Sequence, residues 1–233
     1  MNTVIINILC EGQTEERFVS KVLKPYFEDC GIVLKPRILL TSKKKNQRGG
    51  MISYSQAKRD IENWISENRN RKSETHYYTT MFDFYALPSD FPGMDEIEKY
   101  IDAYDKVSVV ERAMAEKFQV RDFIPYIQLH EFEALLLSDV PQIVAKFPMQ
   151  ERTITKLQKV LDGCNGNPEL VNTGRTTAPS KRIVAVVEES RKYKYHKVQD
   201  GVDIACRIGI KAMMNQCNHF KEWIDKLIAL NVC

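Results

Sequence analysis

Acidic side chains stand directly after several apolar segments of this sequence, each of which is typical of a buried strand. These residues are Glu11, Asp83, Glu131 and Glu133, with His130 beside the last two. In an open parallel sheet, ligands bind beyond the carboxyl ends of the strands, so we expect these side chains to converge on one crevice. Their oxygen atoms suit Mg²⁺ or Mn²⁺. A divalent ion beside a phosphate can activate water, and His130 could serve as a general base, as a ligand or as a helix-capping residue.

The elements that must position these residues are strands alternating with helices. Apolar, aromatic or β-branched runs predict the strands 4–9, 32–40, 76–82 and 123–129. Apolar residues at helical spacing fill the intervals, including a stripe predicted to begin at Met94, Ile97 and Ile101. This alternation predicts an α/β fold with a mainly parallel sheet flanked by helices.

The pattern changes after about residue 140. A loop rich in Gly, Asn, Thr and Pro is expected over 162–179, followed by helices at 183–190, 202–214 and 220–228. We therefore predict a core at 1–140 and a mostly helical C-terminal cap at 141–233, packed on that core.

Basic residues cluster at segments that could contact a phosphate backbone. The first cluster is Lys43, Lys44, Lys45 and Arg48, and the second is Ser180, Lys181 and Arg182, where a serine cap would begin a helix. Lys192, Lys194, His196 and Lys197 form a third cluster, interleaved with tyrosines that could stack on bases. The alternative for the first cluster is a solvated charge run, for the second ordinary helix capping, and for the third a surface helix end.

The bulk composition favours a soluble protein. The 233 residues carry a net charge of +3 and no apolar run as long as a membrane span, and the N-terminal segment has no basic region of a signal peptide. Six scattered cysteines lack zinc spacing and indicate reduced thiols, so a cytoplasmic location is expected. Because no phosphate-binding loop of the G-x-x-x-x-G-K-[ST] type occurs, an ATPase would have to be a separate chain.

Several motifs resemble those of one family. The run ILCEGQTEERF resembles the first motif of the topoisomerase–primase (Toprim) fold, and MFDFYALP resembles the second, which delivers a D-x-D pair. Together with IPYIQLHEFEALLLSD, TAPSKRI and HFKEWIDKL, they resemble the Toprim-like family DUF4276 over most of the chain.

The resemblance implies a Toprim fold with metal-dependent phosphodiester chemistry. It also implies relatives among primases, topoisomerases and nucleases, several of which act in phage defence with an ATPase partner. Glu11 matches the first-motif glutamate and Asp83 the first D-x-D aspartate, but Tyr85 stands where the second aspartate belongs. Glu131 or Glu133 could supply the missing carboxylate; on one helix the two would point about 200° apart, so only one would face a metal.

Three functions are therefore open. The first is a Mg²⁺- or Mn²⁺-dependent nuclease acting on DNA or RNA. The second is a non-catalytic Toprim-like module that binds nucleic acid or an ATPase partner, which Tyr85 favours. The third is a phosphohydrolase for small molecules. The oligomeric state, including a homo-oligomer, is left open by the sequence.

Overall fold

The computed structural model describes residues 2–39, 53–69, 71, 73–118, 120, 122–148, 151–171, 174 and 176–231. The first basic cluster, Lys43, Lys44, Lys45 and Arg48, lies outside these residues, so its contact with a phosphate backbone stays a prediction.

The centre of the fold is a parallel sheet, which confirms the predicted α/β class. Its strands are β1 (Thr3–Cys10), β2 (Ile32–Ile38), β3 (Glu74–Asp83), β4 (Phe123–Ile124) and β5 (Ile127–Gln128). The order is β2-β1-β3-β4, and β5 also pairs with β3. All pairs are parallel, so the strands end at one common edge.

Two prolines shape the margins of the sheet. Pro36 lies in β2, which is an edge strand where a missing N–H is tolerated. The single strand predicted at 123–129 is wrong, because Pro125 divides it into β4 and β5. Tyr126 is held instead by the Thr80 side chain, whose Oγ1 accepts from Tyr126 N at 2.9 Å and donates to Tyr126 O at 2.8 Å.

Helices cover both faces of the sheet and continue past its edge. In the first half they are α1 (Gln13–Phe18), the π-helical turn η1 (Val19–Leu23), α2 (Lys24–Asp29), α3 (Tyr54–Asn68), the 3₁₀ turns η2 (Phe84–Ala86) and η3 (Ile97–Lys99), and α4 (Ala103–Phe118). In the second half they are α5 (Glu133–Leu136), η4 (Leu137–Asp139), α6 (Val140–Lys146), α7 (Glu151–Asp162), η5 (Pro168–Leu170), α8 (Pro179–Val187), the π-helical turn η6 (Lys197–Gly201), α9 (Val202–Ile208), α10 (Ile210–Gln216), α11 (Asn218–Ile228) and η7 (Ala229–Asn231). None of the described helices is long and apolar enough to cross a membrane.

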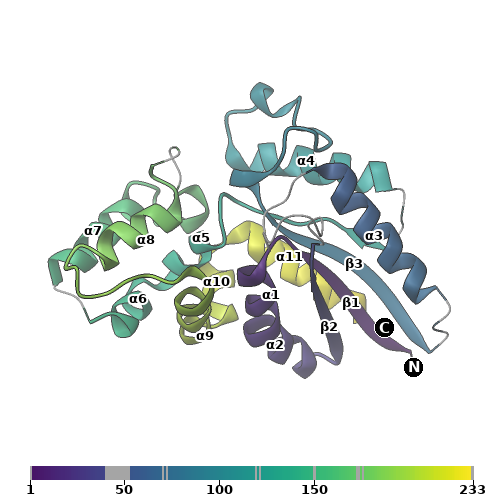
Figure 1. Ribbon diagram of the computed structural model, residues 1–233, viewed down its shortest axis with the longest axis horizontal. Coiled ribbons are helices and arrows are strands. Elements are labelled where there is room, and N and C mark those ends of the chain that lie inside the picture. The colour runs from purple at the N-terminus through teal and green to yellow at the C-terminus, as the bar shows by residue number, and fades with distance from the viewer. Residues whose placement is uncertain are drawn as a thin grey trace, which may run out of the picture.

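Two hydrophobic layers follow from the alternation of side chains along the strands. In β1, Ile6 and Ile8 face a core shared with α1 and the C-terminal helices, whereas Leu9 faces a core shared with α3 and α4. Figure 1 shows α1 and α2 beside β1 and β2, with α6, α7 and α8 grouped beyond the sheet. The C-terminal helices thus enclose the same core as the strands, although the division at residue 140 stays a prediction.

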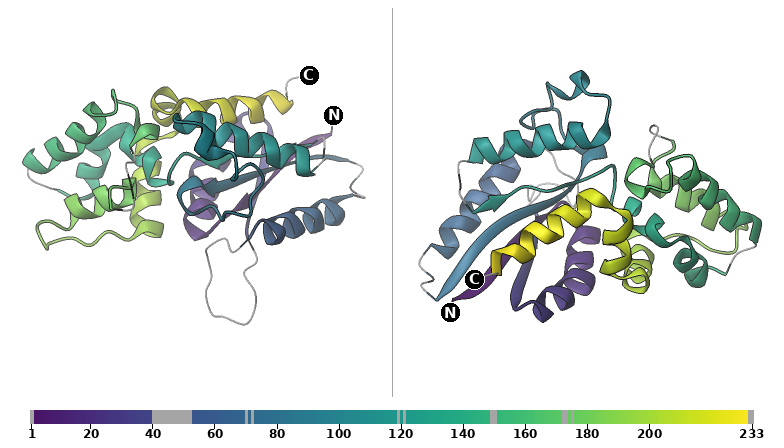
Figure 2. Two further views of the ribbon diagram at one scale, coloured as in Figure 1. Left: turned by 90° about the horizontal axis from the view of Figure 1, so that it is seen from above. Right: turned by 180° about the vertical axis from the view of Figure 1, so that it is seen from behind.

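Helix α11 lies across the sheet on the face opposite α3 (Figure 2). Its Trp223 donates from Nε1 to Thr79 Oγ1 at 2.9 Å and stacks on Tyr126 with ring centroids 4.1 Å apart. This helix was predicted from its apolar face, and the buried Phe220, Trp223 and Leu227 confirm that face.

Two predicted helices differ in the structure. The prediction that a helix begins at Met94 is wrong. Turns and η3 precede α4 in the structure, and Ile101 is fully exposed. Pro92 and Gly93, with φ of 83° at the glycine, place turn-forming residues at its start. The predicted helix 202–214 is divided into α9 and α10 at Gly209, whose φ is 76°.

Candidate functional site

Carboxylates join the end of β1, the end of β3 and the segment before α5. Glu11 follows β1, and its Oε2 accepts a hydrogen bond from Asp83 N at 3.2 Å. Asp83 ends β3, is buried, and its Oδ1 accepts from Phe132 N at 3.0 Å. The structure therefore brings Glu11, Asp83 and the segment before α5 to one point at the carboxyl edge of the sheet, where parallel topology predicts a ligand site.

Glu133 opens α5 and is fully buried. Its Oε2 lies 3.0 Å from Nζ of Lys197, which reaches in from η6 and also stands 3.7 Å from Asp83 Oδ2. The ion pair is close, yet neither Oε atom of Glu133 receives a well-aligned hydrogen bond from the described residues. An ammonium group thus occupies the place between two buried carboxylates.

Glu15 joins this group from the first turn of α1. It is 4% exposed, and its Oε2 accepts from Gly12 N at 2.9 Å, as expected for an acid at a helix start. Its charge also acts on Asp83 and Lys197. We define the carboxylate cluster as Glu11, Glu15, Asp83 and Glu133.

Burial and mutual repulsion dominate the electrostatics of the cluster. Burial raises the pKa of Asp83 well above its usual range; Lys197 opposes this rise, while the charges of Glu15, Glu11 and Glu133 add to it. Burial likewise raises the pKa of Glu133 and of Glu15, again against the effect of Lys197. For Lys197, burial alone would lower the pKa, but the carboxylates outweigh it and raise the pKa above its usual value.

Glu131 has a different partner from Glu133. Its Oε2 accepts from Ser180 N, at the start of α8, at 3.1 Å. A second buried glutamate, Glu169, is used in the same way, because its carboxylate accepts from His219 N and Phe220 N at the start of α11. Glu131 and Glu169 are therefore helix-capping carboxylates, whereas Glu133 faces the cluster.

The contact of Glu131 bears on the second basic cluster. Ala178 is the N-cap and Ser180 lies within α8, so the predicted serine cap is wrong. Glu131 already accepts from the Ser180 N–H that a phosphate would use, and Arg182 Nε donates to Thr177 O at 2.7 Å. Lys181 is exposed. Nucleic-acid binding by Ser180, Lys181 and Arg182 stays a prediction.

His130 and Tyr85 contact each other through their backbones. His130 adopts φ of 63°, rare for a residue with a side chain, and its O accepts from Tyr85 N at 3.0 Å. Burial lowers the pKa of His130 to about 4, although Glu131 opposes this shift, so the ring is neutral at pH 7. Tyr85 is 42% exposed. A base role for His130 stays a prediction.

The donor set fits a hard divalent cation. The cluster offers carboxylate oxygens alone, and neither Oε atom of the buried Glu133 receives a well-aligned hydrogen bond from the described residues. The described side chains include no group of three His, Cys, Asp or Glu already spaced around an ion. A metal bound here would have to take the place of the Lys197 ammonium between Asp83 and Glu133.

The sequence did not predict the contacts of Lys197. It groups this residue with the exposed Lys192, Lys194 and His196, but Lys197 Nζ lies 3.0 Å from Glu133 Oε2 and 3.7 Å from Asp83 Oδ2. No local pattern signals this, because its partners lie more than 60 residues earlier in the chain. The burial of Glu15 was missed for the same reason.

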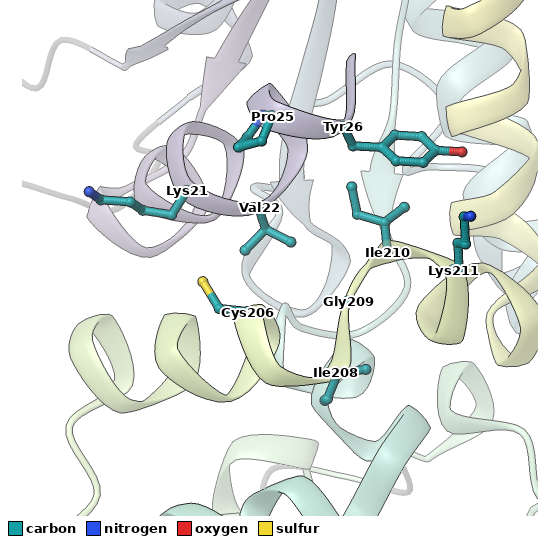
Figure 3. Close-up of a pocket in the computed structure, with 9 residues that line it drawn as sticks. All are labelled: Lys21, Val22, Pro25, Tyr26, Cys206, Ile208, Gly209, Ile210 and Lys211. Atoms are coloured by element: carbon teal, nitrogen blue, oxygen red, sulfur yellow. The ribbon is translucent and has the colours of Figure 1, made fainter. Parts of the chain in front are cut away.

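A separate hollow of about 360 Å³ lies between η1–α2 and the junction of α9 with α10 (Figure 3). Most of its lining side chains are apolar, including Val22, Ile208 and Ile210, and Lys21 and Lys211 stand at its margins. None of the described residues that line it carries a carboxylate, so it offers no counterpart to the cluster.

Comparison with known proteins identifies the family of this chain. The model of the family described as "Domain of unknown function (DUF4276)" matches residues 10–228. The chain belongs to the DUF4276 family. The match includes Glu11, Asp83, Glu133 and Lys197, so the whole cluster lies within the DUF4276 domain.

Among solved structures, the DUF4276 chain is similar to the C-terminal region of the OLD protein of Xanthomonas campestris pv. campestris. The identity is 15%, the TM-score is 0.33, and the alignment covers 99% of this chain and 97% of that chain. No curated protein matches the sequence.

Proposed function

We propose that this protein is a metal-dependent nuclease that hydrolyses phosphodiester bonds in DNA or RNA. Mg²⁺ or Mn²⁺ would be held by Glu11, Asp83 and Glu133. The observation that carries the proposal is the meeting of Glu11, Asp83 and the fully buried Glu133 at the carboxyl edge of the sheet, where Asp83 N donates to Glu11 and one ammonium faces both Asp83 and Glu133. Burying carboxylates together is costly unless cations compensate them, and Lys197 brings one positive charge to the four carboxylates of the cluster, which favours the binding of a further cation.

Each residue of the chain has a distinct part. When bound, the metal would polarise a phosphate oxygen and lower the pKa of water. Asp83 is fixed by Phe132 N, and its own N–H orients Glu11. Glu11 is less buried than Asp83 and Glu133, so we assign it the proton of the attacking water. Lys197 is placed to pair with the carboxylates or with a substrate phosphate.

Glu133 takes the place of the missing second aspartate in this proposal. Glu131 is the alternative from sequence, but its contact with Ser180 N ties it to α8. A role in phage defence with a partner ATPase rests on the resemblance to Toprim nucleases alone and is part of the proposal.

A non-catalytic Toprim-like module is the second candidate. Two observations favour it: Tyr85 lies in an exposed turn where the family resemblance expects an acid, and Lys197 already supplies positive charge to the cluster. Such a module would bind nucleic acid without cleaving it.

Cleavage assays separate the two candidates. Labelled tRNA, single-stranded DNA and duplex DNA are incubated with Mg²⁺, Mn²⁺ or EDTA. The proposal predicts metal-dependent cleavage that Glu11→Gln and Asp83→Asn each reduce by about 10²-fold or more. Glu98→Gln, an exposed acid away from the cluster, is the matched control and should cleave like the wild type. Binding without metal-dependent cleavage of any of the three substrates would favour the non-catalytic module.

A further inference from the structure

A hollow of about 440 Å³ is lined by segments that follow the carboxyl ends of β3 and β5. Its wall includes Phe84, Tyr85, Ile97, Ile101, Lys106 and His130. This volume lies within the range of about 300–1,000 Å³ that small-ligand pockets occupy. We call it the Tyr85 pocket.

Exposed apolar side chains gather at this pocket. In the part of the chain that the structure describes, the large hydrophobic residues that remain exposed are Tyr85, at 42%, and Ile101, at 101%. Both line the Tyr85 pocket. Exposed apolar surface concentrated in one place marks a binding site more often than scattered exposure does.

The pocket is built on the same backbone as the cluster. Phe84 and Tyr85 directly follow Asp83, and His130 directly precedes Glu131. The hydrogen bond from Tyr85 N to His130 O, at 3.0 Å, joins these two segments. The backbone that lines the pocket is thus continuous with the backbone that carries Asp83 and Glu131.

The polar groups of the pocket match one kind of ligand. Tyr85 and Phe84 offer aromatic rings for stacking, and Lys106 offers a positive charge for a phosphate. The imidazole of His130 is neutral at pH 7, because burial lowers its pKa to about 4. A neutral ring suits the uncharged edge of a base better than it suits a phosphate.

We propose that the Tyr85 pocket holds one unpaired nucleobase of a single-stranded nucleic acid, next to the phosphodiester at the carboxylate cluster. The base stacks on Tyr85, and a neighbouring phosphate contacts Lys106. This inference rests on the proposed nucleic-acid function and adds a substrate class, since the bases of an intact duplex are stacked inside the helix and cannot enter. It also gives Tyr85 a role as a specificity residue in place of a lost metal ligand.

The test uses a short oligonucleotide with a central 2-aminopurine, as a single strand and as a duplex, and the full chain in Ca²⁺. Fluorescence of 2-aminopurine falls when it stacks, and anisotropy of an end label gives Kd. Wild type should bind the single strand more tightly than the duplex and quench 2-aminopurine. Tyr85→Ala should raise the Kd for the single strand about 5- to 150-fold and abolish quenching, whereas Tyr85→Phe should change Kd by about twofold or less.

A matched pair of lysine variants tests the phosphate contact. Lys106→Ala should raise Kd about fivefold and lower the slope of log Kd against log salt by about 0.7. Lys99→Ala, whose exposed side chain lies outside the pocket, should leave both unchanged.

Two results would overturn the inference. Single-strand binding that is unaffected by Tyr85→Ala would contradict the base pocket and leave the proposed nucleic-acid function in place. Failure to bind either oligonucleotide would remove both.

Discussion

The ammonium of Lys197 lies 3.0 Å from Oε2 of Glu133, a carboxylate with no exposure to solvent. Lys197 comes from η6 in the C-terminal region, and Glu133 comes from the segment that follows the sheet. Since Asp83 Oδ2 is 3.7 Å from the same ammonium, one lysine from a distant part of the chain balances two buried acids.

Replacing Lys197 should show how much its charge contributes to the stability of the fold. Lys197→Met keeps the length of the side chain but removes its charge, which leaves Asp83 and Glu133 without a counter-ion. We expect the free energy of unfolding to fall by about 1–3 kcal/mol, less than for a fully buried pair because Lys197 is 40% exposed. Urea unfolding in EDTA measures this change, and added Mn²⁺ should restore more stability to the variant than to the wild type. Lys194→Met, an exposed neighbour, is the control; equal stability of the two variants would contradict the prediction.

Metal binding should separate Glu133 from Glu131. Glu133→Gln removes a proposed ligand charge and should weaken Mn²⁺ binding by at least about tenfold, equivalent to about 1.4 kcal/mol. Glu131→Gln can still accept the hydrogen bond from Ser180 N, so it should retain Mn²⁺ affinity and lose about 1 kcal/mol of stability or less. Mn²⁺ titration followed by electron paramagnetic resonance gives both affinities without an activity assay. Loss of affinity in Glu131→Gln alone would reverse the assignment.

Gly201 closes the turn that carries Lys197. A Cβ at this position would lie 2.9 Å from Tyr195 Oη and 3.2 Å from Phe132 Cε1. Gly201→Ala should therefore cost about 1–3 kcal/mol by overpacking. Gly163→Ala meets its neighbours at an ordinary 3.5 Å and should be nearly neutral.

A double variant tests the cause of that cost. Tyr195→Phe removes the hydroxyl that the new methyl group would meet, so Gly201→Ala with Tyr195→Phe should regain part of the lost stability. Thermal unfolding of the single and double variants measures the coupling. If the two effects simply add, the contact with Tyr195 does not explain the loss.

His130 should make the fold sensitive to mild acid. Burial lowers its pKa to about 4 in the folded protein from an ordinary 6.5, so the unfolded chain binds a proton at higher pH than the folded chain does. Protons then favour unfolding, and the stability held above pH 6.5 is lost as pH falls toward 4, by up to about 3 kcal/mol.

Asparagine is the suitable replacement for His130, because it tolerates the φ of 63° and does not titrate. His130→Asn should show a smaller loss of stability between pH 6.5 and 4, measured by urea unfolding at several pH values. His196→Asn, an exposed histidine, is the control. A variant as acid-sensitive as the wild type would argue against a buried neutral His130.

The sequence alone determined the elements whose signals are local. The apolar run of β1, the aromatic β3 and the amphipathic α11 were predicted because burial imposes a period of two or 3.6 residues on the chain. Parallel topology then predicts that Glu11 and Asp83 lie at one edge of the sheet. In the structure, Asp83 N donates a hydrogen bond to Glu11 there. Errors arose where one residue broke a pattern, as Pro125 did in the strand and Gly209 did in the helix.

The residues that complete the site are fixed by contacts between distant segments. Whether Glu131 or Glu133 faces Asp83 depends on α8, which engages Glu131, and the cation among the acids comes from η6. The Tyr85 pocket likewise needs the turns before α4 to pack beside His130. These contacts join residues far apart in sequence, and no periodicity encodes them, because they form only when the separate segments pack against one another.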